Sequence, residues 1–132
     1  MSTTAIYYRE SDGSEPVSDF IDRLAVKKQV PIDNQIDRLN GLADNAPPLA
    51  FPHSSQVEGQ LRELRCHYGS ELYRVLYRRS ENLFILLHMF RKDTGKIRTA
   101  EIQIAKQRWD HFKERMDAPR RRPPRAAGHD AP

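Results

Sequence analysis

The sequence contains little cysteine and no long apolar run. Cysteine occurs once in 132 residues, at Cys66, which excludes an internal disulfide and a multi-cysteine metal site. No stretch approaches the roughly 18 consecutive apolar residues of a membrane-spanning helix. The N-terminal residues lack a basic stretch followed by an apolar core, so no secretory signal is visible. There is no internal repeat. We therefore expect a cytoplasmic protein with no membrane contact.

Charge is distributed unevenly along a chain whose length fits one compact domain. Residues 1–58 carry five Lys or Arg against nine Asp or Glu, whereas residues 59–108 carry eleven against five. An acidic and a basic half suggest two surfaces with different partners. The basic half could attract a polyanion, because neutralised phosphates release counterions. The alternative is a solvated surface of mixed charge.

The first half of the chain indicates one strand and two helices. Residues 5–9 are β-prone and favour a strand. Pro16 can open a helix, because the first turn does not need its missing N–H, and apolar residues at helical spacing follow it. A second helix is expected to start at residues 30–31 and to end at Asn45, before two prolines. Residues 49–60 read as a loop.

The second half indicates three strands and a helix. Segments 61–66, 72–78 and 83–90 are rich in apolar and β-prone residues and predict an antiparallel meander. The last of them is nearly continuous in apolar residues, as in a strand covered on both faces. A final helix is expected to be capped by Thr99 and to continue to Met116.

These elements predict an α+β domain with the order β-α-α-β-β-β-α. Its core would be a small twisted antiparallel sheet with two N-terminal helices and one C-terminal helix against one face. The domain would span residues 1–117. Residues 118–132 are rich in proline and arginine and predict a disordered tail. That tail could attract RNA or simply be a solubilising end.

Four motifs in the second half resemble a known family. They are residues 59–65 (GQLRELR), 73–77 (YRVLY), 85–92 (ILLHMFRK) and 101–108 (EIQIAKQR). In this order and spacing they resemble the RelE/ParE toxin superfamily, and in particular its phage-derived HigB-like branch. The resemblance covers about residues 5–116 and implies a RelE-like fold.

The resemblance also implies a function. RelE-like and HigB-like proteins are toxins of type II toxin–antitoxin systems that bind in the ribosomal A site and cleave mRNA there without a metal or cofactor. The implied partners are mRNA, ribosomal RNA and a cognate antitoxin, usually a DNA-binding protein. ParE-like relatives share the fold but poison DNA gyrase, and fold alone cannot separate the two. A non-catalytic relic that only binds an antitoxin is a third possibility.

Arg74 is the main catalytic candidate. Metal-free RNA cleavage needs a base for the 2′-hydroxyl, positive charge for the reacting phosphate and an acid for the leaving oxygen, and arginine suits the second task. Strand alternation puts Arg74 on the face of Leu72 and Leu76, an unusual place for a cation. The resemblance aligns it with an arginine that contacts the scissile phosphate. The alternative is a buried salt bridge or a snorkelling side chain.

Three further catalytic candidates lie on or just after the third strand. Arg91 and Lys92 follow it at the expected mouth of the site, although a solvated basic turn would look the same. His88 interrupts the apolar strand and could be the acid or base, or a hydrogen-bonded core histidine. The resemblance also implies a tyrosine near the last helix, but no tyrosine follows Tyr77.

Glu63 stands where the resemblance implies a catalytic lysine. It could act as a base, or it could pair with Arg65 or Arg74. Arg62 and Arg65, on the same predicted strand, are candidates for binding RNA. Because they point to opposite faces of that strand, at most one of them can face a site that contains Arg74.

The remaining candidates are expected to bind RNA. His67 and Tyr68, in a predicted turn, could stack on a base or belong to an ordinary turn. Lys96 and Arg98 are expected to contact the phosphate backbone of ribosomal RNA. The five histidines show no spacing typical of a metal site, so we expect no metal.

Overall fold

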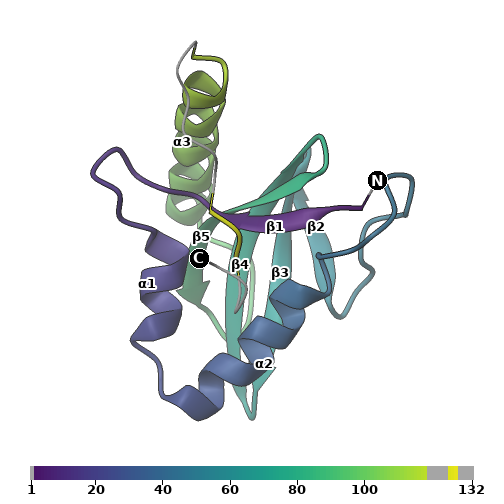
Figure 1. The fold of residues 1–132 in the computed structure, drawn as a ribbon. Coiled ribbons are helices and arrows are strands. Elements are labelled where there is room, and N and C mark those ends of the chain that lie inside the picture. The colour runs from purple at the N-terminus through teal and green to yellow at the C-terminus, as the bar shows by residue number, and fades with distance from the viewer. Residues whose placement is uncertain (1, 119–124, 128–132) are drawn as a thin grey trace.

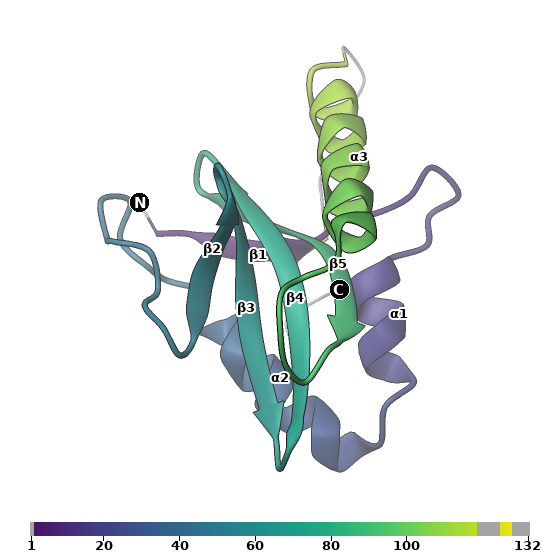
Figure 2. The same ribbon diagram turned by 180° about the vertical axis from the view of Figure 1, so that it is seen from behind.

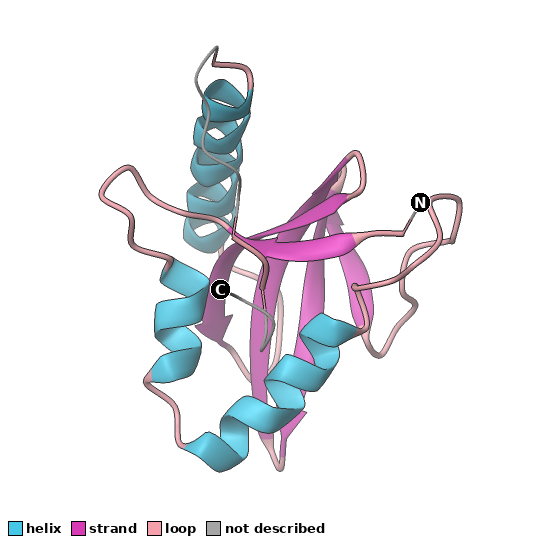
Figure 3. Cartoon of the chain, viewed as in Figure 1, coloured by secondary structure: helices cyan, strands magenta, loops and turns pink. Residues whose placement is uncertain are grey.

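The computed structural model describes residues 2–118 and 125–127, and its elements confirm the α+β class (Figures 1 and 3). The elements are β1 (Thr4–Tyr7), α1 (Pro16–Asp22), α2 (Val26–Asp37), β2 (Ser54–Glu58), β3 (Leu61–Tyr68), β4 (Glu71–Ser80), β5 (Leu83–Arg91) and α3 (Thr99–Met116). No helix in the described part of the chain is both long and apolar enough to cross a membrane.

The sheet has five strands in the order β1-β5-β4-β3-β2. Strands β2 to β5 form an antiparallel meander, which confirms the predicted hairpins. Strand β1 pairs with β5 in parallel, so the expectation of a purely antiparallel sheet is corrected at this edge. A parallel pair needs a long connection, and here the chain passes through two helices and three strands before β5 lies beside β1.

Helices cover both faces of the sheet, not one face as the sequence suggested. Helices α1 and α2 pack on the face that carries Ala5 and Leu86. Helix α3 packs on the opposite face, over Ile6, Ile85 and Leu87. Figures 1 and 2 show the sheet from these two sides. Apolar residues at successive positions of β1 and β5 make both faces hydrophobic, and each face therefore requires its own cover.

Strand β2 lies inside the segment predicted as a loop. It pairs with β3 from Ser54 to Glu58 at the sheet edge. The hydroxyl of Ser54 donates to the Glu63 carbonyl at 2.7 Å and forms a 2.7 Å hydrogen bond with the Tyr77 hydroxyl. The sequence analysis did not predict this strand because its residues are mostly polar. An edge strand buries little apolar surface, so apolar and polar residues alternate only weakly along it.

Two helix boundaries also differ from the prediction. Helix α2 begins at Val26, contains Pro31 and ends at Asp37. Pro31 removes one backbone donor from the helix, but burial of Ile32 and Ile36 against the sheet holds the helix in place. Thr99 does not cap α3, because it is the first helical residue and the N-cap position is Arg98, which has no side-chain capping bond.

Part of the predicted tail lies beside β1. The Tyr7 N–H donates to the Arg125 carbonyl at 3.3 Å, and the Ala127 N–H donates to the Ala5 carbonyl at 2.8 Å. Arg125 also pairs with the buried Glu15. Residues 119–124 and 128–132 lie outside the described residues, so disorder in them stays a prediction.

Candidate functional site

A cleft of about 730 Å³ opens on the α3 face of the sheet. Its walls are β2, β3 and β4 on one side and the loop before α3 with the first turn of α3 on the other. Figure 2 shows this loop crossing in front of β4. The charged residues that line the cleft are Glu63, Arg65, Arg74, Asp93 and Lys96. The cleft therefore brings together charged side chains from two strands and a loop.

Arg74 is fixed in the wall of this cleft. It is 5% exposed and shares its face with Leu72 and Leu76, as alternation predicted. Its Nε donates to the Lys92 carbonyl at 3.1 Å, and its Nη1 lies 3.4 Å from Glu63 Oε2. The hydrogen bonds that Arg74 makes to other described residues use Nε and Nη1, and the residue lines the cleft. Its Nη2 donors are therefore the ones left for a ligand there.

Glu63 is an ion-pair partner of two arginines. It is 3% exposed, and its Oε1 accepts from Arg65 Nη1 at 2.9 Å and from the Ser55 hydroxyl at 3.0 Å. Its Oε2 faces Arg74. The pairing considered from the sequence is thus observed with both arginines. This carboxylate holds the two guanidinium groups in place, which leaves it poorly placed to accept a proton from a substrate.

Only Arg65 of the two arginines on β3 faces the cleft. Arg65 lies directly opposite Arg74 in the β3–β4 register, so both side chains are on the α3 face. Arg62 is on the other face, where its Nη2 donates to the Leu49 carbonyl at 2.8 Å. Arg62 is therefore not brought to the site.

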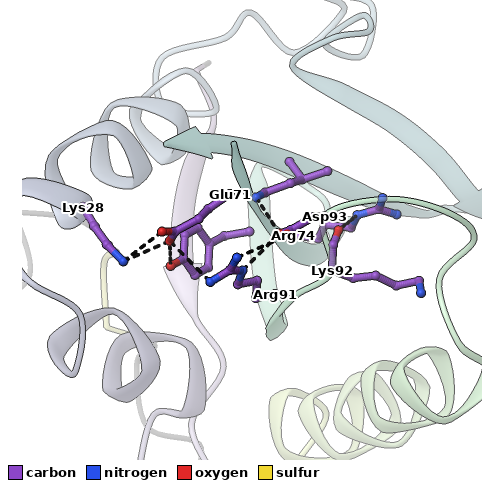
Figure 4. Close-up of polar contacts among 8 residues, drawn as sticks. Lys28, Glu71, Arg74, Arg91, Lys92 and Asp93 are labelled. Carbon is purple, nitrogen blue, oxygen red and sulfur yellow. Dashed lines mark hydrogen bonds and ion pairs between the residues drawn. The ribbon is translucent and has the colours of Figure 1, made fainter. Parts of the chain in front are cut away.

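Arg91 belongs to a different group of charges, at the end of the sheet (Figure 4). Its guanidinium bonds Asp93 through two nitrogens, each at 3.0 Å, and lies 3.7 Å from Glu71. Lys28 of α2 contacts the same Glu71 at 3.0 Å. In Figure 4 Arg91 points toward Glu71 and the Lys92 side chain points away from it. Arg91 therefore does not reach the cleft. Lys92 contributes only its backbone carbonyl, which accepts a hydrogen bond from Arg74.

Hydrogen bonds in this group favour the charged form of its carboxylates. The Arg91 guanidinium and the Leu72 N–H lower the pKa of Asp93 to about 2. The Tyr73 hydroxyl and Lys28 lower the pKa of Glu71. The group therefore stays ionised at neutral pH and ties β4, β5 and α2 together.

His88 packs under α3, outside the cleft lining. Its Nδ1 lies 3.1 Å from Arg108 Nη1, its Nε2 lies 3.3 Å from Glu101, and its ring stacks on Phe90. Because arginine can only donate, Nδ1 must be unprotonated and the neutral ring carries its proton on Nε2. Burial, with a smaller contribution from the charge of Arg108, lowers the pKa of His88. The structure thus gives His88 the partners of a core histidine.

The predicted RNA-binding residues are scattered. His67 and Tyr68 are the last two residues of β3, not part of the turn, and alternation points them to opposite faces. The ring centroid of Tyr68 lies 5.8 Å from Lys28 Nζ, on the face of the sheet that α2 covers. Lys96 lines the cleft, and Arg98 is exposed at the start of α3.

One exposed aromatic residue was missed by the sequence analysis. Phe51 lies just before β2 and is 69% exposed, with the Arg65 guanidinium carbon 5.0 Å from its ring centroid. A lone phenylalanine in a segment read as a loop gave no signal, because only the pairing of β2 with β3 brings it beside Arg65.

Groups of three or more His, Cys, Asp or Glu side chains that could hold a metal are absent from residues 2–118 and 125–127. No curated protein matches the chain. Residues 19–110 match the family described as phage derived protein Gp49-like (DUF891), which is related to the RelE-like toxins of toxin–antitoxin modules. This match spans most of the chain, from α1 to α3, and the chain therefore belongs to the phage-derived Gp49-like family.

Proposed function

We propose that this protein is the toxin of a type II toxin–antitoxin module. In this proposal it is a metal-independent endonuclease that cleaves mRNA on the ribosome in the cytoplasm, inhibits translation and is neutralised by a cognate antitoxin. Membership of the Gp49-like family supports a toxin of such a module. The nuclease activity rests on the resemblance to HigB-like toxins and on the cleft.

The observation that carries this proposal is the fixed position of Arg74. Its guanidinium is buried, bonded to the Lys92 carbonyl and paired with Glu63, and Arg65 and Lys96 line the same cleft. Positive charge that is already in place costs no reorganisation when negative charge develops on a substrate. A guanidinium also presents several donors in one plane, which suits phosphate oxygens.

The reaction would be a transfer within the RNA chain. The ribose 2′-oxygen attacks the adjacent phosphorus and loses its proton, the bond from phosphorus to the 5′-oxygen breaks, and that oxygen gains a proton. The products are a 2′,3′-cyclic phosphate and a 5′-hydroxyl. Arg74, with Arg65, would stabilise the additional negative charge on the phosphate oxygens. Neither Glu63, which is held by two arginines, nor His88, which is held by Arg108, is placed as the general base.

Glu63 also favours a second candidate function, in which the protein binds DNA gyrase or another protein and cleaves nothing. This carboxylate stands where the resemblance implies a lysine, and it neutralises part of the positive charge of Arg65 and Arg74. A non-catalytic relic that only binds its antitoxin would have the same feature.

Expression of the wild type, Arg74→Ala and Arg79→Ala separates these functions. Arg79 is a matched control, because it lies on the same strand but faces Phe84 and Asp44 on the opposite side of the sheet. We expect wild type and Arg79→Ala to arrest growth and to create new 5′ ends inside translated codons, and Arg74→Ala to do neither. Growth arrest with intact mRNA would reject the nuclease and make gyrase supercoiling the next assay. Absence of arrest would favour the relic.

A further inference from the structure

Phe51 is a large apolar side chain exposed beside the cleft. Among the described residues the other large apolar side chains with comparable exposure are Val26 and Val30, both on α2. Phe51 is the aromatic one of the three, and its neighbour Arg65 lines the cleft. The solvent-exposed ring of Phe51, next to the Arg65 guanidinium, is therefore suited to stack on a planar group of a ligand.

The charges around Phe51 favour an anionic partner. Arg65 lies against the ring and also faces Glu63, and Arg74 and Lys96 add two further cations to the lining of the same cleft. Asp93, the other acid of the cleft lining, is neutralised by Arg91. Aromatic side chains next to a cationic groove are what proteins use to bind single-stranded nucleic acid, because bases stack on the ring while cations follow the backbone.

We infer that Phe51 and Arg65 form a subsite that holds one nucleobase of single-stranded RNA by stacking, next to the phosphate held at Arg74. This inference rests on the proposed function for its substrate class. The subsite would tolerate any base, because every base has a π face and the ring offers no hydrogen bond. A protein partner that buries Phe51 is the competing occupant, and in that case Phe51→Ala would bind RNA as tightly as the wild type.

The test uses short single-stranded RNA with 2′-O-methyl groups, so that binding is measured without cleavage. Fluorescence anisotropy would give Kd for the full-length wild type, Phe51→Ala, Phe51→Trp and Val30→Ala. We expect Phe51→Ala to raise Kd about 5- to 150-fold, since that is the range for loss of one stacked base. Phe51→Trp should bind at least as tightly as the wild type. Val30→Ala, which shortens an exposed apolar side chain on another face, should not change Kd.

Abasic substitution identifies the base. Each position of the RNA is replaced in turn by an abasic nucleotide, and the ratio of Kd values for Phe51→Ala and wild type is measured. At one position this ratio should fall to about one, because neither protein can then stack. A ratio that is unchanged at every position would overturn the inference, as would equal binding by Phe51→Ala or no saturable wild-type binding at millimolar RNA.

These outcomes are independent of the test of the proposed function. If the wild type cleaves mRNA in cells but Phe51→Ala binds RNA normally, the stacking inference is wrong and the nuclease proposal stands. If mRNA stays intact but binding depends on Phe51 and on one base, the nuclease proposal is wrong and the subsite stands.

Discussion

Glu63 and Arg74 form an ion pair of 3.4 Å in which both side chains are almost fully buried. The second oxygen of Glu63 faces Arg65, so one carboxylate orients two guanidinium groups that come from adjacent strands. Burying charge is costly unless it is paired and hydrogen-bonded. Glu63 therefore acts as a positioning residue. Its negative charge offsets the repulsion between Arg65 and Arg74 and so allows both guanidinium groups to lie in the wall of the cleft.

We predict that Glu63→Ala lowers the free energy of unfolding by about 3 kcal/mol, the lower end of the range for breaking a buried ion pair. The variant leaves Arg65 and Arg74 close together without a counter-charge. Urea unfolding followed by circular dichroism would measure the change.

The matched control is Glu58→Ala. Glu58 pairs with Lys106, but both side chains are about half exposed, so this change should cost less than about 1 kcal/mol. Equal losses for the two variants would contradict the structural role of Glu63.

Arg74→Lys tests whether charge alone is sufficient. Lysine keeps the positive charge, but its ammonium lacks the planar fork that contacts the Lys92 carbonyl and Glu63 together. Under the proposed function we expect mRNA cleavage to fall about 10²-fold or more, a loss comparable to removing one fixed donor. Quantitative mapping of 5′ ends after equal expression would measure it. Full activity of Arg74→Lys would show that geometry at this position does not matter.

The fold was largely predictable because most elements carry strong local signals. Strands β3, β4 and β5 have β-prone apolar runs separated by short turns, and α3 has an apolar stripe. Strand β2 could not be predicted, because Ser54 is buried by pairing with β3, and the residues next to Ser54 in the sequence give no sign of that pairing. The start of α2 was misplaced because Pro31 looks like a helix start when tertiary packing is unknown.

The site was predictable only where alternation along a strand determines direction. Alternation placed Arg74 on the face of Leu72 and Leu76, as the structure has it. It showed only that at most one of Arg62 and Arg65 could share that face, and the β3–β4 register of the structure selects Arg65. Arg91 was misassigned because the predicted strand ended at Phe90. As the last residue of β5 it pairs with Tyr73 and points to the face opposite Arg74, where Glu71 and Asp93 bind it. The position of Phe51 beside Arg65 depends on the pairing of β2 with β3, and no local sequence pattern predicts it.

The buried thiol of Cys66 should be almost unreactive in the folded protein. Burial, with a smaller contribution from Asp33, raises its pKa to about 12. Little thiolate therefore exists at pH 8, and thiolate is the reactive form. We expect an aromatic disulfide reagent to react on the order of 10³-fold more slowly with the native chain than with the urea-unfolded chain, in proportion to the thiolate fractions. Fast native labelling would show that the cluster under α1 and α2 opens readily.

The pKa of His88 predicts a loss of stability in mild acid. Burial lowers this pKa in the folded state, and Arg108 on one side opposes protonation while Glu101 on the other favours it. Because the unfolded chain then binds a proton more readily than the folded chain, the free energy of unfolding is highest above the unfolded pKa of about 6.5. It decreases as pH falls from there toward the folded pKa.

Urea unfolding of the wild type and His88→Gln from about pH 7.5 to pH 5 would measure this effect. Glutamine cannot titrate, and the other groups of the chain are common to both proteins. The wild type should therefore lose more unfolding free energy than His88→Gln across this window, and the His88 ring signals in NMR should titrate below pH 6.5. Parallel pH profiles would contradict the prediction, because they would show that Glu101 offsets burial. A ring that titrates above the ordinary value would show that Glu101 outweighs burial and that His88 is available as an acid in the folded protein.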